Sequence, residues 1–489
     1  MIDKATALHL SNRLGFGPAP GDIERIGAQG LDGWLGDQLH PDTSKLPPSV
    51  TSALRELPSF GLSSADAYAR YWWRDQVTDP AAISKEEKTR LKKSEKQVVH
   101  EAQIARLARA VGSPWQLQEA LVEFWFNHFN VYEKKGPIKV WIGSYEEEAI
   151  RPHTLGRFSD LLLATAKHPA MLVYLDSTLN VAPMGAGQDK MASARPEKKR
   201  PNGINENYAR EVMELHTLGV EGGYTQQDVI SLAHILTGWT VGPGAESEVA
   251  AAADKFGRNR GAFRFAQRRH DPSPEALLGR RFSGDDAAEG EAALLMLATH
   301  PATANHISFQ LAQYFVTDKP DSTLVGAMAM TFRATGGDIR SVMHTMLAST
   351  SFLDAANFGT KFKTPYRYVV SAARAAGVPP ANVHPLVHAL QDLGQTLYGC
   401  VSPDGYACTQ SAWLDPDALL HRIAFATQLG EGEYGASVGA DGAPAPLDPT
   451  RIEKTLAPAL GRSTLAILSE TPKDRRAGAI LGSPDFMRC

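Results

Sequence analysis

The sequence is poor in cysteine, has no long apolar run and carries no large excess of one charge. Its three cysteines are too few for a disulfide scaffold, and their spacing matches no zinc signature. No apolar stretch approaches the length that a membrane-spanning helix needs. Because 50 basic residues stand against 54 acidic ones, the chain has no basic footprint for nucleic acid. We therefore expect a protein that neither spans a membrane nor binds nucleic acid.

The short motifs of familiar enzyme classes are also missing. The chain has no G-x-S-x-G sequence of a serine hydrolase, no Walker A sequence and no C-x-x-C pair. The glycines of "GFGPAPG" have the wrong spacing for a dinucleotide site. His100-Glu101 is not followed by the second histidine of a zincin. No local motif therefore indicates a particular cofactor or nucleophile.

The N-terminal segment has no apolar core of a secretory signal. The chain as given is predicted to be cytoplasmic by default, or exported if a leader has been removed. Cys400 and Cys408 flank the loop "CVSPDGYAC", where they are either a disulfide pair or two unrelated thiols.

Helical periodicity dominates what is present. Hydrophobic residues make up 43% of the chain and charged residues 21%, which is typical of a soluble protein with a large core. We predict a mainly α fold, a large multi-helix single body with a small β-hairpin insertion in which "AFRFA" pairs with "GRRFSG". Helices are predicted at residues 64–78, 85–111, 139–150, 154–167, 225–239, 287–299, 302–316, 338–348, 364–376, 385–397 and 416–429, with another starting at Ser113.

The predicted domain organisation is one helical domain over residues 1–430 and a C-terminal extension, 431–489, packed on it or trailing from it. A loop rich in Gly and Pro at 183–203 marks a point of subdivision, and residues 241–283 form an insertion that holds the hairpin. Such loops are often functional lids or disordered. The basic group Lys198, Lys199 and Arg200 either recruits an anion or is simply solvated.

The stretch "NENYAREVMELHTLGV" is an unusually polar helix start. We expect Asn205 to cap it, because its side chain can accept a free backbone N–H. A regular helix turns about 100° per residue. Tyr208, Val212 and Leu215 then share one face, which we predict to be a packing face.

A second face of the same helix carries Asn207, Glu211 and Glu214. Two carboxylates three residues apart repel one another if both are charged. They can instead share a cation, or one of them can stay protonated and act as a general acid. The structural alternative is a solvated face with Arg210 alongside. In a regular helix His216 lies on the far flank, so one metal ion would not be held by both Glu211 and His216.

Further polar residues lie at positions where packing does not obviously require them. His128 sits among aromatic residues in "FWFNHFNV" and is either a hydrogen-bonded core residue or a ligand. Arg151 and His153 surround a helix break. They either cap the helix and form ion pairs there, or bind substrate. His270 and Asp271 occupy a turn, and polar loop residues often carry function.

These residues occur within a recognisable series of motifs. The series includes "NRLGFGPAPGDIERI", "FWFNHFNV", "NENYAREVMELHTLGVEGGYTQQDV", "LTGW", "HPATANHI", "KFKTPYRYVV" and "PDGYACTQSAWLDPDAL". In this order they resemble the bacterial domain of unknown function 1800 family (DUF1800), over nearly the whole chain. The resemblance implies a mostly α-helical protein and association with a sulfatase-like companion, the domain of unknown function 1501. It also reveals one departure: this chain has Glu275 in "HDPSPE" where the family commonly has lysine.

Two main hypotheses follow. The first is an enzyme, such as a metal-dependent hydrolase, acting on an anionic or polar substrate; its catalytic set would be Asn207, Glu211, Glu214, His128, His270 and Asp271. Arg151, His153 and Arg210 would bind substrate, and a divalent metal would be held by Glu211, Glu214 and His128. The second is a non-catalytic partner or maturation factor for the sulfatase-like companion. A polysaccharide-binding module is a weaker third option.

Overall fold

The computed structural model describes residues 2–75, 77, 82–183, 203–242, 261–284, 286–435 and 445–489. Most of the two long loops expected at 183–203 and 242–261 lies outside these residues. The basic group Lys198, Lys199 and Arg200 lies outside them as well.

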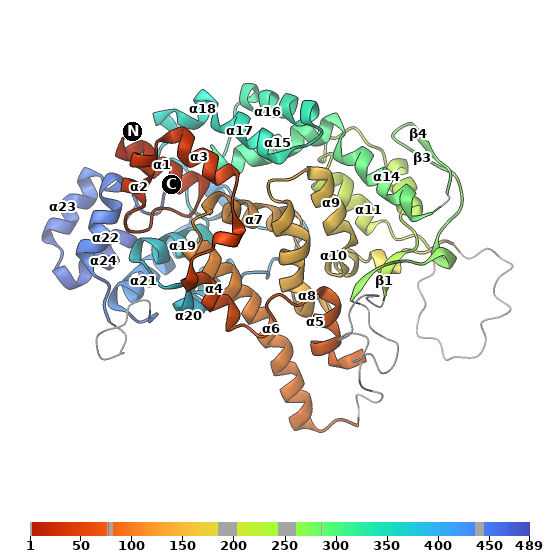
Figure 1. The fold of residues 1–489 in the computed structure, drawn as a ribbon, viewed down its shortest axis with the longest axis horizontal. Coiled ribbons are helices and arrows are strands. Elements are labelled where there is room, and N and C mark those ends of the chain that lie inside the picture. Colours follow the sequence, from red (N-terminus) through yellow and green to blue (C-terminus); the bar gives the residue numbers. More distant parts are fainter. Residues whose placement is uncertain are drawn as a thin grey trace.

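The fold is mainly α, as the helical periodicity predicts (Figure 1). The α-helices up to the middle of the chain are α1 (Lys4–Leu14), α2 (Asp22–Gln29), α3 (Leu31–Leu39), α4 (Pro48–Arg55), α5 (Ser64–Tyr71), α6 (Lys85–Gly112), α7 (Gln116–His128), α8 (Ile138–Ser144), α9 (Phe158–Lys167), α10 (Pro169–Tyr174), α11 (Asn207–Glu211) and α12 (Gln226–Ile235). Those that follow are α14 (Ala287–Ala298), α15 (Pro301–Phe315), α16 (Ser322–Thr335), α17 (Ile339–Leu347), α18 (Thr350–Leu353), α19 (Pro365–Ala376), α20 (His384–Asp392), α21 (Pro416–Glu431), α22 (Pro449–Leu456), α23 (Arg462–Glu470) and α24 (Arg476–Leu481).

Local capping explains where several helices begin and end. At the start of α12, the Thr225 side chain accepts the Asp228 N–H, and the Asp228 carboxylate accepts the Thr225 N–H, a reciprocal capping box. Helix α16 starts at the side-chain cap Asp321 and ends at Gly336, whose φ of 65° lies in the left-handed region. Helix α7 begins at Gln116, slightly later than expected, because the Ser113 hydroxyl accepts the Trp115 N–H in the preceding turn.

The four short strands form two separate antiparallel pairs, so the predicted pairing of "AFRFA" with "GRRFSG" is wrong. Strand β1 (Trp239–Gly242) pairs with β2 (Ala262–Phe265), and β3 (Glu275–Leu277) pairs with β4 (Arg280–Phe282). The second pair is a local hairpin whose two turn residues, Leu278 and Gly279, have φ values of 49° and 79°. Because β4 already pairs with its nearest neighbour in the chain, β2 pairs with the strand that follows α12.

The C-terminal helices pack onto the rest of the molecule near α1 and α19 (Figure 1). The buried Tyr368 hydroxyl donates to the carbonyls of Arg422, at 3.1 Å, and Leu481, at 2.8 Å. It therefore joins α19, α21 and α24. Among the described residues, no helix has the length and apolar character needed to cross a membrane.

Candidate functional site

The polar stretch at Asn205 is a short α-helix that changes into a π-helix. Helix α11 ends at Glu211, and the π-helix η7 (Val212–His216) continues it. The Asn205 carboxamide accepts the Asn207 N–H at 3.0 Å, but the N-cap position of α11 is Glu206, one residue later than expected, and its side chain makes no capping bond. Tyr208 and Val212 are buried, as the packing face predicts, whereas Leu215 is only half-buried. The regular-helix expectation therefore holds for the first turn and is wrong beyond it.

The π-helix exposes two backbone carbonyls that histidines from other helices satisfy. The Leu215 carbonyl lies 3.1 Å from His306 Nε2, and the His216 carbonyl lies 3.1 Å from His128 Nε2. The His216 ring is buried and lies 5.9 Å, between ring centroids, from His128. Tertiary packing therefore brings His216 beside His128. His216 was expected to point away from Glu211, but that expectation assumed a regular α-helix.

His128 is a neutral hydrogen-bonded histidine at neutral pH. Burial lowers its pKa to about 3, and the neighbouring His306 adds to this shift. Since a carbonyl can only accept, the bond to His216 requires the hydrogen on Nε2, which leaves Nδ1 as an acceptor. A group with so low a pKa is a poor general base, but it can receive a hydrogen bond from a ligand.

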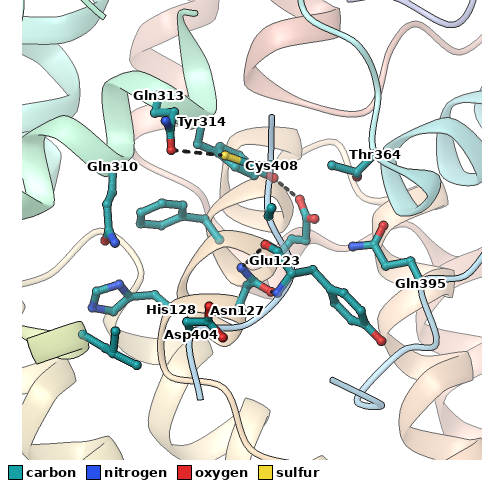
Figure 2. Close-up of a pocket in the computed structure, with 14 residues that line it drawn as sticks. Glu123, Asn127, His128, Gln310, Gln313, Tyr314, Thr364, Gln395, Asp404 and Cys408 are labelled. Carbon is teal, nitrogen blue, oxygen red and sulfur yellow. Dashed lines mark hydrogen bonds between the residues drawn. The ribbon is translucent and has the colours of Figure 1, made fainter. Parts of the chain in front are cut away.

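His128 lines a polar cavity of about 170 Å³ between α7, α15 and the loop at 399–409 (Figure 2). The lining residues are Glu123, Phe124, Asn127, His128, Leu215, Gln310, Gln313, Tyr314, Thr364, Gln395, Asp404, Tyr406, Ala407 and Cys408. No lysine or arginine is among these lining residues, and most of their polar groups are uncharged amides or hydroxyls. The cavity therefore offers many hydrogen-bonding groups and two carboxylates.

Asparagine side chains of α7 and the following turn hold the loop that carries Asp404. Asn127 Nδ2 donates to the Tyr406 carbonyl at 2.9 Å, and its Oδ1 accepts the Tyr406 N–H at 2.7 Å. Asn130 donates to the Ser402 carbonyl at 2.8 Å. Gly405 has a φ of 73°, and a Cβ there would collide with the Asn127 carbonyl oxygen. Glycine at this position therefore permits the close contact that positions the loop.

The charge of one lining carboxylate, Glu123, is offset inside the protein. The Tyr314 hydroxyl donates to Glu123 Oε2. The guanidinium of Arg367 lies over the Tyr314 ring, 4.4 Å from its centroid, and its charge opposes that of Glu123. Burial raises the pKa of Tyr314 well above its usual value, and the Glu123 charge adds to this effect. Glu123 and Tyr314 therefore form a buried hydrogen-bonded pair at the back of the cavity.

The other lining carboxylate, Asp404, belongs to what we call the carboxylate cluster: Asp404, Glu211 and Glu214. Burial raises the pKa of Glu211, and the charges of Glu214 and Asp404 raise it further, whereas Arg210 lowers it. Arg210 is itself engaged, because its NH2 group lies 2.9 Å from a carboxylate oxygen of Glu206. The predicted catalytic residue Glu211 thus interacts electrostatically with Glu214 and with an aspartate of the cavity, although neither glutamate lines the cavity. Asn207 precedes them on the half-buried start of α11.

The predicted substrate-binding residue Arg151 lies elsewhere, in a buried ion network. We define this network by its six members: Arg106, Arg109, Arg151, Glu119, Glu146 and Glu147. The Arg151 guanidinium contacts Glu119 at 2.9 Å and Glu146 at 3.1 Å. These carboxylates already pair with the guanidinium group of Arg151, which was expected from the sequence to bind an anionic substrate. His153 is half-buried and does not line the cavity, and Arg210 pairs with Glu206.

His270 and Asp271 also lie apart from the cavity lining, against the end of α12. His270 Nδ1 is 3.0 Å from the Thr237 carbonyl, and Asp271 Oδ2 is 2.7 Å from His234 Nδ1. Glu275, which stands where the family commonly has lysine, is 3.7 Å from the same nitrogen of His234. The structure therefore does not bring the predicted catalytic residues to one cavity. His128 lines the cavity, Glu211 interacts electrostatically with the lining residue Asp404, and the turn residues form a separate group.

The described residues contain no group of three or more His, Cys, Asp or Glu side chains that could hold a metal ion. The geometry thus does not support a divalent-metal site made of Glu211, Glu214 and His128. Cys400 and Cys408 are free thiols, which answers the alternatives left by the sequence. Burial raises the pKa of the Cys408 thiol, so a thiolate nucleophile is not favoured there.

Several lining residues were missed from the sequence, notably Glu123, Asn127, Gln310, Asp404 and Tyr406. Asn127 lies inside "FWFNHFNV" and Asp404 inside "PDGYAC", so both belong to motifs that carried the resemblance. The Asp-Gly pair is also a turn signal. Nothing in their local pattern, however, indicates that α7, α15 and this loop meet.

A family model described as "Protein of unknown function (DUF1800)" matches residues 9–488. The chain therefore belongs to the DUF1800 family. Searches of curated proteins and of solved structures found no match to it.

Proposed function

We propose that this DUF1800 protein is an enzyme that binds a small polar substrate in the cavity beside Asp404 and converts it by acid–base chemistry. The observation that supports the proposal is the carboxylate cluster at a polar cavity. There, burial and two like charges raise the pKa of Glu211. Carboxylates in unequal environments are the usual source of an acid and a base within one site.

In this proposal each residue has a distinct role. Glu211, whose pKa is raised, would donate the proton as the general acid, and Asp404 would accept one as the base. Asn127 positions Asp404 through its two hydrogen bonds to Tyr406. His128 Nδ1 and the lining glutamines orient the substrate by hydrogen bonding.

The test is a search for turnover that depends on the two carboxylates. The purified protein is incubated with a bacterial metabolite extract, and consumed compounds are identified by mass spectrometry. Asp404→Asn and Glu211→Gln should each slow the consumption by about 10²–10⁴-fold, the usual contribution of a general acid or base. Glu221→Gln, at an exposed carboxylate on the turn after η7, is the matched control and should leave the rate unchanged. Turnover that persists in both active-site variants, or no difference between wild type and Asp404→Asn, would reject the proposal.

A second candidate function is that of a partner for the sulfatase-like companion implied by the family resemblance. An apolar groove with a volume of about 630 Å³ lies between α21, α23 and α24 and supports this candidate. Ile423 and Ile467 line it and are 47% and 61% exposed, which is unusual for large apolar side chains. Ile467→Glu should abolish co-purification with the companion, whereas Asp404→Asn should not. Co-purification that resists both Ile467→Glu and Ile423→Glu would exclude this groove.

A further inference from the structure

We propose that the ligand of the cavity carries a positive charge, as a small amine or guanidine compound does. This inference rests on the proposed function and names the substrate class of the same site. It replaces the anionic class expected from Arg151 and Arg210, since both of these side chains are engaged by carboxylates.

The lining leaves a negative charge that the cavity itself does not offset. Of its two carboxylates, Glu123 is opposed by Arg367 through Tyr314. Asp404 accepts a hydrogen bond from the Ser402 hydroxyl, which is neutral. The neighbouring side chain on which the Asp404 charge acts, Glu211, is another carboxylate and supplies no positive charge. Asp404 is exposed, so water solvates its charge in the free protein, and a cationic ligand beside it would pair with that charge.

Three basic side chains of this part of the structure are already paired. Arg210 binds Glu206 at 2.9 Å, and Lys135 binds Asp176 at 2.8 Å. Lys361, which anchors the far end of the loop through the Cys408 carbonyl, binds Asp318 at 2.5 Å. Each of these cations is therefore directed to its own carboxylate and away from Asp404.

The uncharged part of the lining also suits a cation with N–H groups. Gln310 hydrogen-bonds to the His128 ring through its carboxamide, and its buried Oε1 has no other partner among the described residues. It is drawn in Figure 2 with its carboxamide towards His128, whose Nδ1 is likewise an acceptor. A ligand ammonium or guanidinium group would donate to such acceptors. The rings of Phe124 and Tyr406 add the faces that attract cations.

The experiment compares three probes that share one ring and differ only in charge: benzylamine, benzyl alcohol and benzoate. Their dissociation constants for the full chain are measured by ligand-observed NMR at low ionic strength. We expect benzylamine to bind at least about tenfold tighter than benzyl alcohol, and benzoate to bind most weakly. Asp404→Asn should reduce the affinity for benzylamine about tenfold and leave that for benzyl alcohol unchanged.

Controls separate the charge inference from the existence of the site. Glu221→Gln removes an exposed carboxylate outside the cluster and should not alter any of the three affinities. Glu211→Gln provides a second charge-removing variant if Asp404→Asn melts early. If benzyl alcohol or benzoate binds as tightly as benzylamine, and Tyr406→Ala weakens all three, the site stands and the cationic class is wrong. If no probe responds to Tyr406→Ala, the cavity is not a ligand site and the proposed function fails with it.

Discussion

Two groups in this protein each contain three carboxylates, but their electrostatic surroundings are opposite. In the buried ion network, the three guanidinium groups of Arg106, Arg109 and Arg151 face three carboxylates at contact distance. In the carboxylate cluster, three carboxylates lie near one another, and the adjacent Arg210 pairs outside the cluster. The first group neutralises itself, whereas the second leaves charge for something else to neutralise.

This difference in pairing separates charged residues with a structural role from those that are candidates for function. A buried charge must be paired, so an arginine with three carboxylate neighbours already has a structural explanation. Like charges held together without cations are unfavourable for folding, and a site that tolerates them is a functional candidate. The predictions below test this contrast, beginning with the largest expected effect.

The largest effect should come from breaking the buried ion network. Arg151→Met leaves Glu119 and Glu146 buried without this cation, and should lower the free energy of unfolding by about 3–5 kcal/mol. The same substitution at Arg210, whose ion pair with Glu206 is largely exposed, should cost no more than about 1 kcal/mol. Urea denaturation of both variants measures the two values. Equal losses would show that burial does not distinguish the two arginines.

Acidification should destabilise the fold through its buried histidines. Burial lowers the pKa of both His9 and His128 to about 3 in the folded protein, below the usual value near 6.5. Between these values the unfolded chain binds more protons, so stability falls as pH falls from about 6.5 towards 3. Each histidine contributes a slope of about 1.4 kcal/mol per pH unit.

His128→Gln should remove one such contribution from the slope, measured as unfolding free energy against pH between about 6.5 and 4.5. Phe129→Leu is the control, because it disturbs the same aromatic group without removing a titrating side chain. An unchanged slope in His128→Gln would mean that its imidazole is not excluded from water as the structure indicates.

Gly405→Ala should destabilise the protein and displace Asp404. The left-handed backbone costs alanine about 1–2 kcal/mol, and the contact with Asn127 adds to this. Gly394, with a φ of 82° and no atom within 4 Å of an added Cβ, is the matched control for the backbone cost alone. Thermal unfolding should show a larger loss for Gly405→Ala than for Gly394→Ala. Equal losses would show that the loop moves freely away from Asn127.

The smallest effect should come from Asp404→Asn, and its sign should be opposite to that of Arg151→Met. Removing one of several like charges should leave stability unchanged or raise it by a few tenths of a kcal/mol. It should also lower the pKa of Glu211, because the Asp404 charge helps to raise it. Carboxyl NMR of ¹³C-labelled glutamate measures this shift. A pKa that rises or stays constant would remove Asp404 from the cluster.

Much of the helical fold could be predicted because its signals are local. Helix α6, expected at 85–111, spans Lys85–Gly112, and the burial of Tyr208 and Val212 follows from their spacing. The pairing of β2 could not be predicted in this way, because its partner lies across a long loop. The π-helix was missed for a similar reason, since its freed carbonyls are satisfied by His128 and His306 from distant helices.

The site residues likewise divide into those that the sequence predicts and those that only the tertiary structure reveals. Glu211 and Glu214 could be singled out from the sequence because their spacing on one helix is unusual. Their neighbour Asp404 could not, because it comes from a loop nearly two hundred residues away and reaches the cavity through Asn127. Arg151 was misread as substrate-binding because a sequence does not show that three carboxylates surround it.

The sequence by itself determined the helical class, the family and the polar residues worth testing, because periodicity, caps and motifs are properties of neighbouring residues. Only the tertiary structure decided which charges are paired. That depends on distances between side chains brought together from separate helices. Arg151 and Asp404 both lie in family motifs, yet one is neutralised by its surroundings and the other is not.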